Sequence, residues 1–226
     1  MNESAELSVE EGYTRWAALY DDDGNPLIAL EGPLVQGWLG PIQGRRALDL
    51  GCGTGRHTEA LVSAGAIVSA ADLTLAMLLR AHEKLASHSV GWLRAALPGP
   101  LPFADATFQL VVMGLVAEHL TDLRGSLREV SRVLEPKGRL ILTALHPDRT
   151  AEGQRARFID PDTGERTPIA TIHRSINEYC KTADSVGLVL IEQRSLTVSS
   201  ELADRLPRAM RYVGKNLGWG ALFEAN

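Results

Sequence analysis

The sequence predicts an α/β fold, in which a mostly parallel β-sheet carries helices on both faces. From residue 45 onward, short apolar runs of strand length alternate with segments whose apolar residues recur at helical spacing. A glycine-rich turn, 51–55, joins the first of these strands to the first helix. Such an alternation builds βαβ units, whose strands lie parallel and are covered on both faces. A chain of 226 residues is large enough for one such domain with additions.

The strands and helices of this domain follow one another in a regular order. The strands are expected at 45–50, 66–71, 90–95, 109–116, 139–145, 188–195 and 219–225. The run at 109–116 is almost continuously apolar, as is typical of a strand that is covered on both faces. Helices are expected up to residue 64 and at 73–87, 121–134 and 200–214, and one more begins at Ser175 with the capping-box pattern Ser175-x-x-Glu178. The turn 136–138 ends the helix at 121–134.

Two regions lie outside this alternation. Residues 1–44 hold helical pieces rich in Trp and Tyr, and residues 147–172 are polar and rich in turn-forming residues. A loop as long as 147–172 is usually an active-site cover or disordered. We expect a single domain over 1–226: a helical cover (1–44), a core (45–146), a lid (147–172) and the completion of the sheet (173–226).

Composition excludes several classes of protein. The hydrophobic share of 45% and charged share of 23% are those of a soluble globular protein, and no apolar run is long enough for a membrane span. The net charge of −5 disfavours nucleic acid as a partner, and the cationic stripe Arg205, Arg208, Arg211 and Lys215 is expected on a solvated helix face. Two cysteines form no disulfide framework and the acidic start resembles no signal peptide, so we expect a cytoplasmic protein.

The strongest motif is Asp49-Leu-Gly-Cys-Gly-Thr-Gly55, at the carboxyl end of the first strand. Glycines there let a ligand approach the backbone, and Arg56 stands where a nicotinamide fingerprint has its third glycine. Asp49 would repel a pyrophosphate and suits a ligand with an ammonium or sulfonium charge, such as S-adenosylmethionine. Asp72 ends the second strand and is placed to accept ribose hydroxyls, its alternative role being a helix N-cap.

Four ordered segments carry a family resemblance. They read LDLGCGTGRHTEAL, AADLTLAMLLRA, LPFADATFQLVVMGLVAEHL and LREVSRVLEPKGRLIL. The chain resembles the class I S-adenosylmethionine-dependent methyltransferases, above all the small-molecule branch with ubiquinone- and menaquinone-biosynthesis-type enzymes. The resemblance is strong over 45–146. It implies a Rossmann-like seven-stranded sheet in the order 3-2-1-4-5-7-6 with the last strand antiparallel, and methyl transfer from S-adenosylmethionine to a small-molecule acceptor.

The resemblance also implies a role for particular residues. Gly51, Cys52 and Gly53 would line the methionine part of the cofactor, with Asp49 nearby. Asp72 would hold the ribose, and Leu73 and Met77 would pack on the adenine. The Leu97 amide would bind the adenine ring, and the Met113 backbone would contact the methionine ammonium. Ala96 stands where the family often has an acid that accepts from the adenine amino group, so adenine would be held by water, backbone and packing.

Acceptor and base are less determined. His119 and His146 follow the fourth and fifth strands and are the candidate general bases, each with a packing or capping role as its alternative. Glu118 could orient a histidine or hold a cation, and His173 could reach the pocket. Tyr13, Trp16 and Tyr20 form one stripe of an N-terminal helix, which either packs in the core or closes over cofactor and acceptor. His57, His82 and His88 are expected on helix surfaces, and Arg149, Arg155 and Arg157 are available for an anionic group.

Other functions stay open at this point. An RNA or protein methyltransferase, a dinucleotide oxidoreductase and a non-catalytic S-adenosylmethionine-binding module are the alternatives. No histidine–carboxylate cluster has metal-ligand spacing, so no metal is expected. The sequence predicts neither the acceptor, nor which of its atoms is methylated, nor the oligomeric state.

Overall fold

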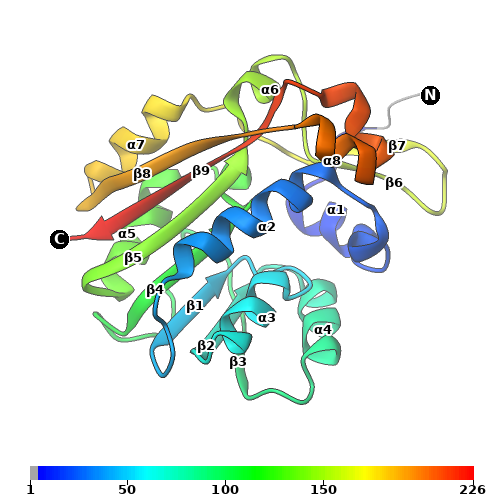
Figure 1. The fold of residues 1–226 in the computed structure, drawn as a ribbon. Helices are drawn as coiled ribbons and strands as arrows, with labels where there is room; N and C mark the ends of the chain where they lie inside the picture. Colours follow the sequence, from blue (N-terminus) through cyan, green and yellow to red (C-terminus); the bar gives the residue numbers. More distant parts are fainter. Residues whose placement is uncertain (1–4) are drawn as a thin grey trace.

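The computed structural model describes residues 5–226, which form a central sheet flanked by helices (Figure 1). The strands of this sheet are β1 (Arg46–Leu50), β2 (Ile67–Asp72), β3 (Val90–Arg94), β4 (Phe108–Gly114), β5 (Leu134–Leu145), β8 (Leu188–Thr197) and β9 (Asn216–Ala225). The α-helices are α1 (Val9–Trp16), α2 (Pro26–Leu39), α3 (Arg56–Ser63), α4 (Leu75–Lys84), α5 (Leu123–Val133), α6 (Pro147–Ala151), α7 (Ile176–Asp184) and α8 (Ser200–Arg205). Three short 3₁₀ helices are η1 (Tyr20–Asp22), η2 (Ala117–His119) and η3 (Pro207–Tyr212).

The seven-stranded sheet has the order β3-β2-β1-β4-β5-β9-β8. β9 runs antiparallel to both of its neighbours, whereas β1 to β5 pair in parallel. Counted within this sheet alone, the order is 3-2-1-4-5-7-6, so the predicted fold class is confirmed. The labels run on to nine because β6 (Arg157–Ile159) and β7 (Arg166–Pro168) form a separate antiparallel hairpin.

Helices on the two faces enclose two main apolar clusters. On one face, α5 and α7 pack together and bury a cluster that includes Leu48, Val111 and Leu127. On the other, α2 and α3 bury a cluster that includes Ala47 and Val112. Consecutive residues of β1 and β4 thus face opposite layers, which explains their nearly continuous apolar sequence.

The segment 147–172 differs from the irregular loop that its composition predicts. It contains the short helix α6 and the hairpin β6–β7. Phe158 and Ile169 of this segment pack on Trp16 of the N-terminal helix α1. The hairpin is therefore held by a small apolar cluster of its own, which the many polar residues around it conceal in the sequence.

Three further predictions about elements were wrong in detail. The helix expected at 200–214 is broken at Pro207, which has no amide hydrogen to continue it, so α8 is followed by η3 and the four basic residues share no single helix. β5 begins at Leu134 and runs through the turn expected at 136–138, where Lys137 has a φ of +65°. The aromatic stripe is divided, because α1 ends at Trp16 and Tyr20 belongs to η1.

The N-terminal segment is attached to the hairpin rather than to the sheet alone. Ser8 caps α1 with the capping box that Glu11 completes. The amide of Leu7 donates to the Pro168 carbonyl over 3.0 Å, and the Leu7 carbonyl accepts from Ala170 over 3.0 Å. Figure 1 shows α1 and the hairpin on the same side of the molecule. This arrangement places the aromatic residues of α1 over the carboxyl edge of the sheet.

Candidate active site

A pocket lies at the carboxyl ends of β1, β2 and β4, where parallel α/β sheets bind their ligands. Its wall includes residues from the glycine turn, from the end of β2, from α1 and from η2. Of the residues for which a cofactor, acceptor or catalytic role is expected, those lining it are Gly51, Gly53, Asp72, Leu73, Met77, Leu97, Tyr13, Tyr20 and His119. We call it the cofactor pocket.

The glycine turn brings β1 against the end of β4. Gly51 has a φ of +79°, and a Cβ on it would lie 2.2 Å from a methyl carbon of Val116. Only glycine fits this position, because both the backbone conformation and the close approach exclude a side chain. The amides of Gly51 and Cys52 donate to the Ala71 carbonyl, and that of Gly53 donates to Asp72. These three amides therefore hold the turn together and are engaged within the chain.

Asp72 joins the two loops that border the pocket. Its Oδ2 accepts from the Gly53 amide and its Oδ1 from the Thr74 amide, each over 2.8 Å. Burial raises the pKa of Asp72, while the two backbone hydrogen bonds oppose that change. Each carboxylate oxygen has a second lone pair, so the side chain can still accept two hydroxyl hydrogens. Asp72 thus serves both as a loop anchor and as an acceptor that faces the cavity.

An apolar slot continues from Asp72 and would take a flat ring. Leu73 and Met77 come from the start of α4, Leu97 follows β3, and Val9 of α1 closes the slot from above. Met77 is 1% exposed and is therefore fixed in place by its neighbours. An apolar slot beside a carboxylate that can accept hydroxyl hydrogens fits a nucleoside.

Three residues that were assigned to the cofactor lie behind the pocket wall instead of in it. Asp49 is fully buried and its Oδ2 accepts from the Thr58 hydroxyl over 2.6 Å. The Cys52 side chain packs with Ala70 and Leu78. Met113 is fully buried in the core under α5. Their suggested contacts with the cofactor stay predictions, and the contact suggested for Met113 is one of its backbone.

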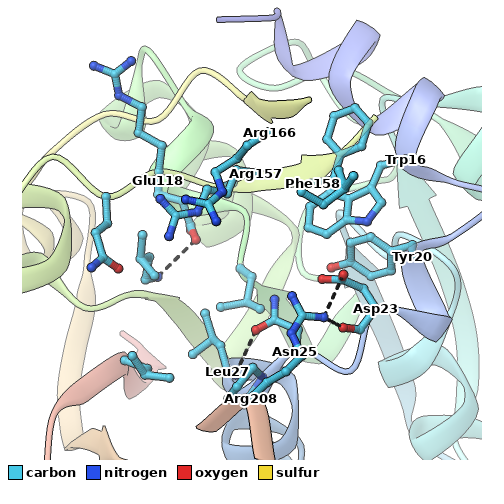
Figure 2. Close-up of a pocket in the computed structure, with 18 of the residues that line it drawn as sticks. Trp16, Tyr20, Asp23, Asn25, Leu27, Glu118, Arg157, Phe158, Arg166 and Arg208 are labelled. Atoms are coloured by element: carbon cyan, nitrogen blue, oxygen red, sulfur yellow. Dashed lines mark hydrogen bonds and ion pairs between the residues drawn. The ribbon is translucent and has the colours of Figure 1, made fainter. Parts of the chain in front are cut away.

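A second pocket adjoins the first and extends toward the hairpin (Figure 2). Tyr13, Tyr20 and Leu115 line both pockets and form the partition between them. Trp16 and Phe158 lie on the wall of the second pocket, with their rings stacked at 5.6 Å between centroids. We call it the acceptor pocket, because a reactant bound there would lie across the partition from the cofactor pocket.

His119 and Tyr13 form a hydrogen-bonded pair at this partition. The His119 Nδ1 lies 2.6 Å from the Ala170 carbonyl oxygen, which can only accept, so Nδ1 carries a proton. In the neutral ring Nε2 is then an acceptor, and the Tyr13 hydroxyl donates to it over 2.9 Å. Burial raises the pKa of Tyr13 well above its usual value, so the phenol stays protonated at neutral pH.

Glu118 precedes this histidine and lines the acceptor pocket. Its Oε1 accepts from the Leu145 amide over 3.1 Å, whereas Oε2 is buried and has no hydrogen-bond partner among residues 5–226. Burial raises the pKa of Glu118, and the neighbouring His119 opposes that change. A buried carboxylate oxygen with free acceptor capacity is costly unless a ligand or water uses it.

The other histidines lie elsewhere. His146 is not among the described residues that line the two pockets; its Nδ1 accepts from the Asp148 amide at the start of α6, and its Nε2 lies 3.1 Å from the Ser195 hydroxyl. Its role as a base stays a prediction. His173 lies 2.7 Å from the Thr150 hydroxyl. The expectation of an exposed His57 was wrong, since this side chain is buried.

Sequence reasoning missed a buried ionic network behind the cofactor pocket. Glu31 of α2 accepts from His57 and from the Thr143 hydroxyl, each over 2.8 Å, and pairs with Arg56 at 2.5 Å. Burial alone would raise the pKa of Glu31, but the hydrogen bonds and charges of His57 and Arg56 outweigh it and hold this pKa at about 2. An acid inside an apolar helix, with no partner nearby in the chain, was the available signal.

Comparison with known proteins agrees with this geometry. Residues 48–142 match the family model described as a methyltransferase domain. A solved S-adenosylmethionine-dependent methyltransferase from Mesorhizobium loti is similar in fold, with a TM-score of 0.74 and 21% identity over 88% of this chain and 100% of the other.

Two curated relatives are similar in sequence. The demethylmenaquinone methyltransferase of Corynebacterium urealyticum is 40% identical over 99 residues, which are 44% of this chain and 41% of that protein. The malonyl-[acyl-carrier protein] O-methyltransferase of Erwinia billingiae is 34% identical over 110 residues, 49% of this chain and 43% of that protein.

Fold and family match agree: the sheet is that of class I methyltransferases of known structure, and residues 48–142, less than half of the chain, match the methyltransferase-domain model. The match with each of the two curated relatives covers less than half of that relative's length. Among the described residues, no helix is long and apolar enough to cross a membrane.

Proposed function

We propose that the protein transfers a methyl group from S-adenosylmethionine to a small-molecule acceptor. The observation that carries this proposal is the pair of adjoining pockets with a shared partition. One has the carboxylate and apolar slot of a nucleoside site, and the other has a wall of arginine and aromatic side chains. A donor and an acceptor bound in this way would meet at the partition, which is the arrangement that in-line transfer requires.

The residues present fit the proposed cofactor. Asp72 offers two acceptor positions for the ribose, and Leu73, Met77 and Leu97 offer an apolar slot for the adenine. The buried Oδ1 of Asp49 has no hydrogen-bond partner within the described chain, and its charge favours a cationic ligand nearby. When bound, S-adenosylmethionine supplies a methyl carbon that its sulfonium already activates.

The chain itself would then position the acceptor and remove a proton. The Tyr13 oxygen lies at the partition and can accept a hydrogen bond from an acceptor hydroxyl or amine. As that proton moves to Tyr13, the phenolic proton moves to Nε2 of His119, so that no charged phenolate accumulates. The Ala170 carbonyl accepts from Nδ1 and would stabilise the resulting imidazolium. The aromatic side chains of the N-terminal segment, Tyr13, Trp16 and Tyr20, would exclude water during transfer.

Several finer points belong to the same proposal. The net charge of −5 supports a small acceptor rather than a nucleic acid. Cys52 and Cys180 are both free thiols, which supports a reducing, cytoplasmic location. The two curated relatives act on a demethylmenaquinone and on a malonyl-carrier protein according to their names, and neither substrate is assigned to this chain.

Calorimetry with S-adenosylmethionine tests the proposal directly. We expect saturable binding, and we expect Asp72→Asn to weaken it by tenfold or more, because the variant loses a charged acceptor at the ribose. Asp184→Asn, at the exposed end of α7, is the matched control and should bind like the original protein. Absence of binding, or equal affinity of the two variants while both remain folded by circular dichroism, would show that the nucleoside is not held here.

A further inference from the structure

We propose that the acceptor carries an anionic carboxylate or phosphate group, and that Arg157 and Arg166 of the hairpin bind that group. This inference rests on the proposed function for what the acceptor pocket is used for. Its own basis is the charge, pairing and placement of the arginines in the pocket wall. It names a substrate class and two substrate-binding residues.

The acceptor pocket is electropositive in an acidic protein. Among residues 5–226, five arginines and two acids line it, although the whole chain has a net charge of −5. A cleft with charge of one sign concentrates ligands of the opposite sign, and its partly apolar walls strengthen the field inside it. The cavity therefore favours an anionic reactant over a neutral or cationic one.

Pairing within the chain separates these arginines into two groups. Arg155 is paired with Glu6 at 2.9 Å and Arg208 with Asp23 at 3.0 Å, so acids already neutralise them. The side chains of Arg157 and Arg166, by contrast, make no hydrogen bond or ion pair with any residue in the described part of the chain. They are the cations in this wall, together with Arg211, that are available to a ligand.

The acids of the wall do not supply the missing partner. Asp23 is taken by Arg208, and Glu118 has one oxygen bonded to the Leu145 amide. Glu118 lies beyond ion-pair distance from both hairpin arginines, since no pair within 4.0 Å joins them. An arriving anion would thus be the first counter-charge that Arg157 and Arg166 meet.

The hairpin register places the two guanidinium groups together. Arg157 lies opposite Pro168 and Arg166 opposite Ile159, so the two arginines are diagonal neighbours on one face of the hairpin. Side chains as long as arginine reach each other across such a diagonal. Figure 2 shows both extending into the pocket from the hairpin. Two planar guanidinium groups from adjacent strands can hold one carboxylate or phosphate by several charge-assisted hydrogen bonds.

The rest of the wall indicates what accompanies the anionic group. Trp16, Tyr20 and Phe158 form an aromatic surface on the side of the cover, and Leu27 and Leu115 lie below it. Large aromatic faces bind flat or apolar bodies, and a few convergent polar groups orient them. The acceptor is therefore an organic acid with an apolar or aromatic body. A carboxylic acid and a phosphate monoester share this chemistry.

Ligand binding measured with simple acids tests the inference without turnover. The probes are benzoate, phenyl phosphate and the uncharged benzamide, each titrated into the full chain and followed by the fluorescence of its four tryptophans, of which Trp16 lines the acceptor pocket. We expect one of the two acids to bind at least tenfold more tightly than benzamide, and the tighter of them identifies carboxylate or phosphate. We expect added salt to weaken the binding of the acid, because Arg157 and Arg166 are partly exposed to solvent and dissolved ions screen their charge.

Variants then assign the binding to the hairpin. Arg157→Gln and Arg166→Gln should each weaken binding of the preferred acid by about tenfold or more and leave benzamide unchanged. Arg166→Lys keeps the charge and should recover part of the affinity. Arg128→Gln on the exposed face of α5 is the matched control and should bind normally.

The outcomes separate this inference from the proposed function. Acids that bind no tighter than benzamide, or variants that bind them as well as the original protein does, would overturn the inference whether or not S-adenosylmethionine binds. Binding of S-adenosylmethionine together with such a result would leave the proposed methyl transfer in place with a neutral acceptor. Acid binding without S-adenosylmethionine binding would support the anion site and refute the methyltransferase.

Discussion

Replacement of Glu31 by glutamine should strongly destabilise the protein. Glu31 is fully buried and is the shared partner of Arg56, His57 and Thr143, which come from α3 and β5. Glutamine has nearly the same size but no charge. It therefore leaves Arg56 without its countercharge, and its amide can no longer accept from all three donors. Removal of one partner from a buried ion pair is among the most damaging single substitutions.

The magnitude follows from the pKa of Glu31. A carboxyl whose pKa falls from 4.5 to about 2 on folding contributes roughly 3 kcal/mol to the free energy of unfolding at neutral pH. That contribution is present in full above pH 4.5 and is lost as the pH falls toward 2, because the folded-state pKa is the lower one. For a chain of this size, 3 kcal/mol corresponds to a Tm lower by roughly 6–12 °C.

Thermal and urea unfolding, followed by circular dichroism from pH 7 to pH 3, measure both effects. Glu10→Gln is the matched control, because it breaks an exposed ion pair with Arg94 and should cost at most about 1 kcal/mol. Glu31→Gln should lose stability at pH 7 and show a flatter acid dependence than the original protein. Equal stability of the two variants at pH 7 would refute the assignment of this network as a structural anchor. So would a loss of stability between pH 7 and pH 3 that is as large in Glu31→Gln as in the original protein.

Three other perturbations address the pockets. Tyr13→Phe should lower turnover by about a hundredfold, because it removes the hydroxyl that is bonded to His119. Tyr20→Phe removes a hydroxyl from the same wall that is not bonded to a histidine, and it should have a small effect. Equal effects of the two variants would contradict the proton route. Gly51→Ala should lower the free energy of unfolding by about 2 kcal/mol or more in urea titrations and should abolish cofactor binding, and a fully stable variant would show that the turn can relax. Cys52 should resist a thiol reagent at pH 8 until the protein unfolds, because burial raises its pKa well above the usual value. The less buried Cys180 should react first. Modification in the reverse order would be inconsistent with the packing.

The sequence was informative wherever local chemistry and strand periodicity coincide. The glycine turn, Asp72 and the capping box at Ser175 each depend on neighbours within a few residues, and all three lie where their patterns predict. The fold class followed in the same way, because parallel strands that are buried on both faces have an unmistakable apolar pattern.

The acceptor pocket could not be predicted from local sequence patterns, because its residues come from distant parts of the chain. Arg166 has no local partner and Arg157 was only one of several candidate cations, and it is the hairpin register that joins them. Arg149, also expected to be available for an anionic group, is buried and paired with Glu152. Glu31 and His57 are likewise 26 residues apart in sequence and meet only through the packing of α2 on α3.

The shared partition of Tyr13, Tyr20 and Leu115 has a practical consequence for inhibitor design. A compound that links an adenosine to an aromatic acid by a short tether could occupy both cavities at once. Its second half would bind at the high effective concentration that the tether imposes, so that two modest affinities combine into a strong one. Relatives that share only the nucleoside half would bind such a molecule much less tightly, and selectivity would come from the hairpin.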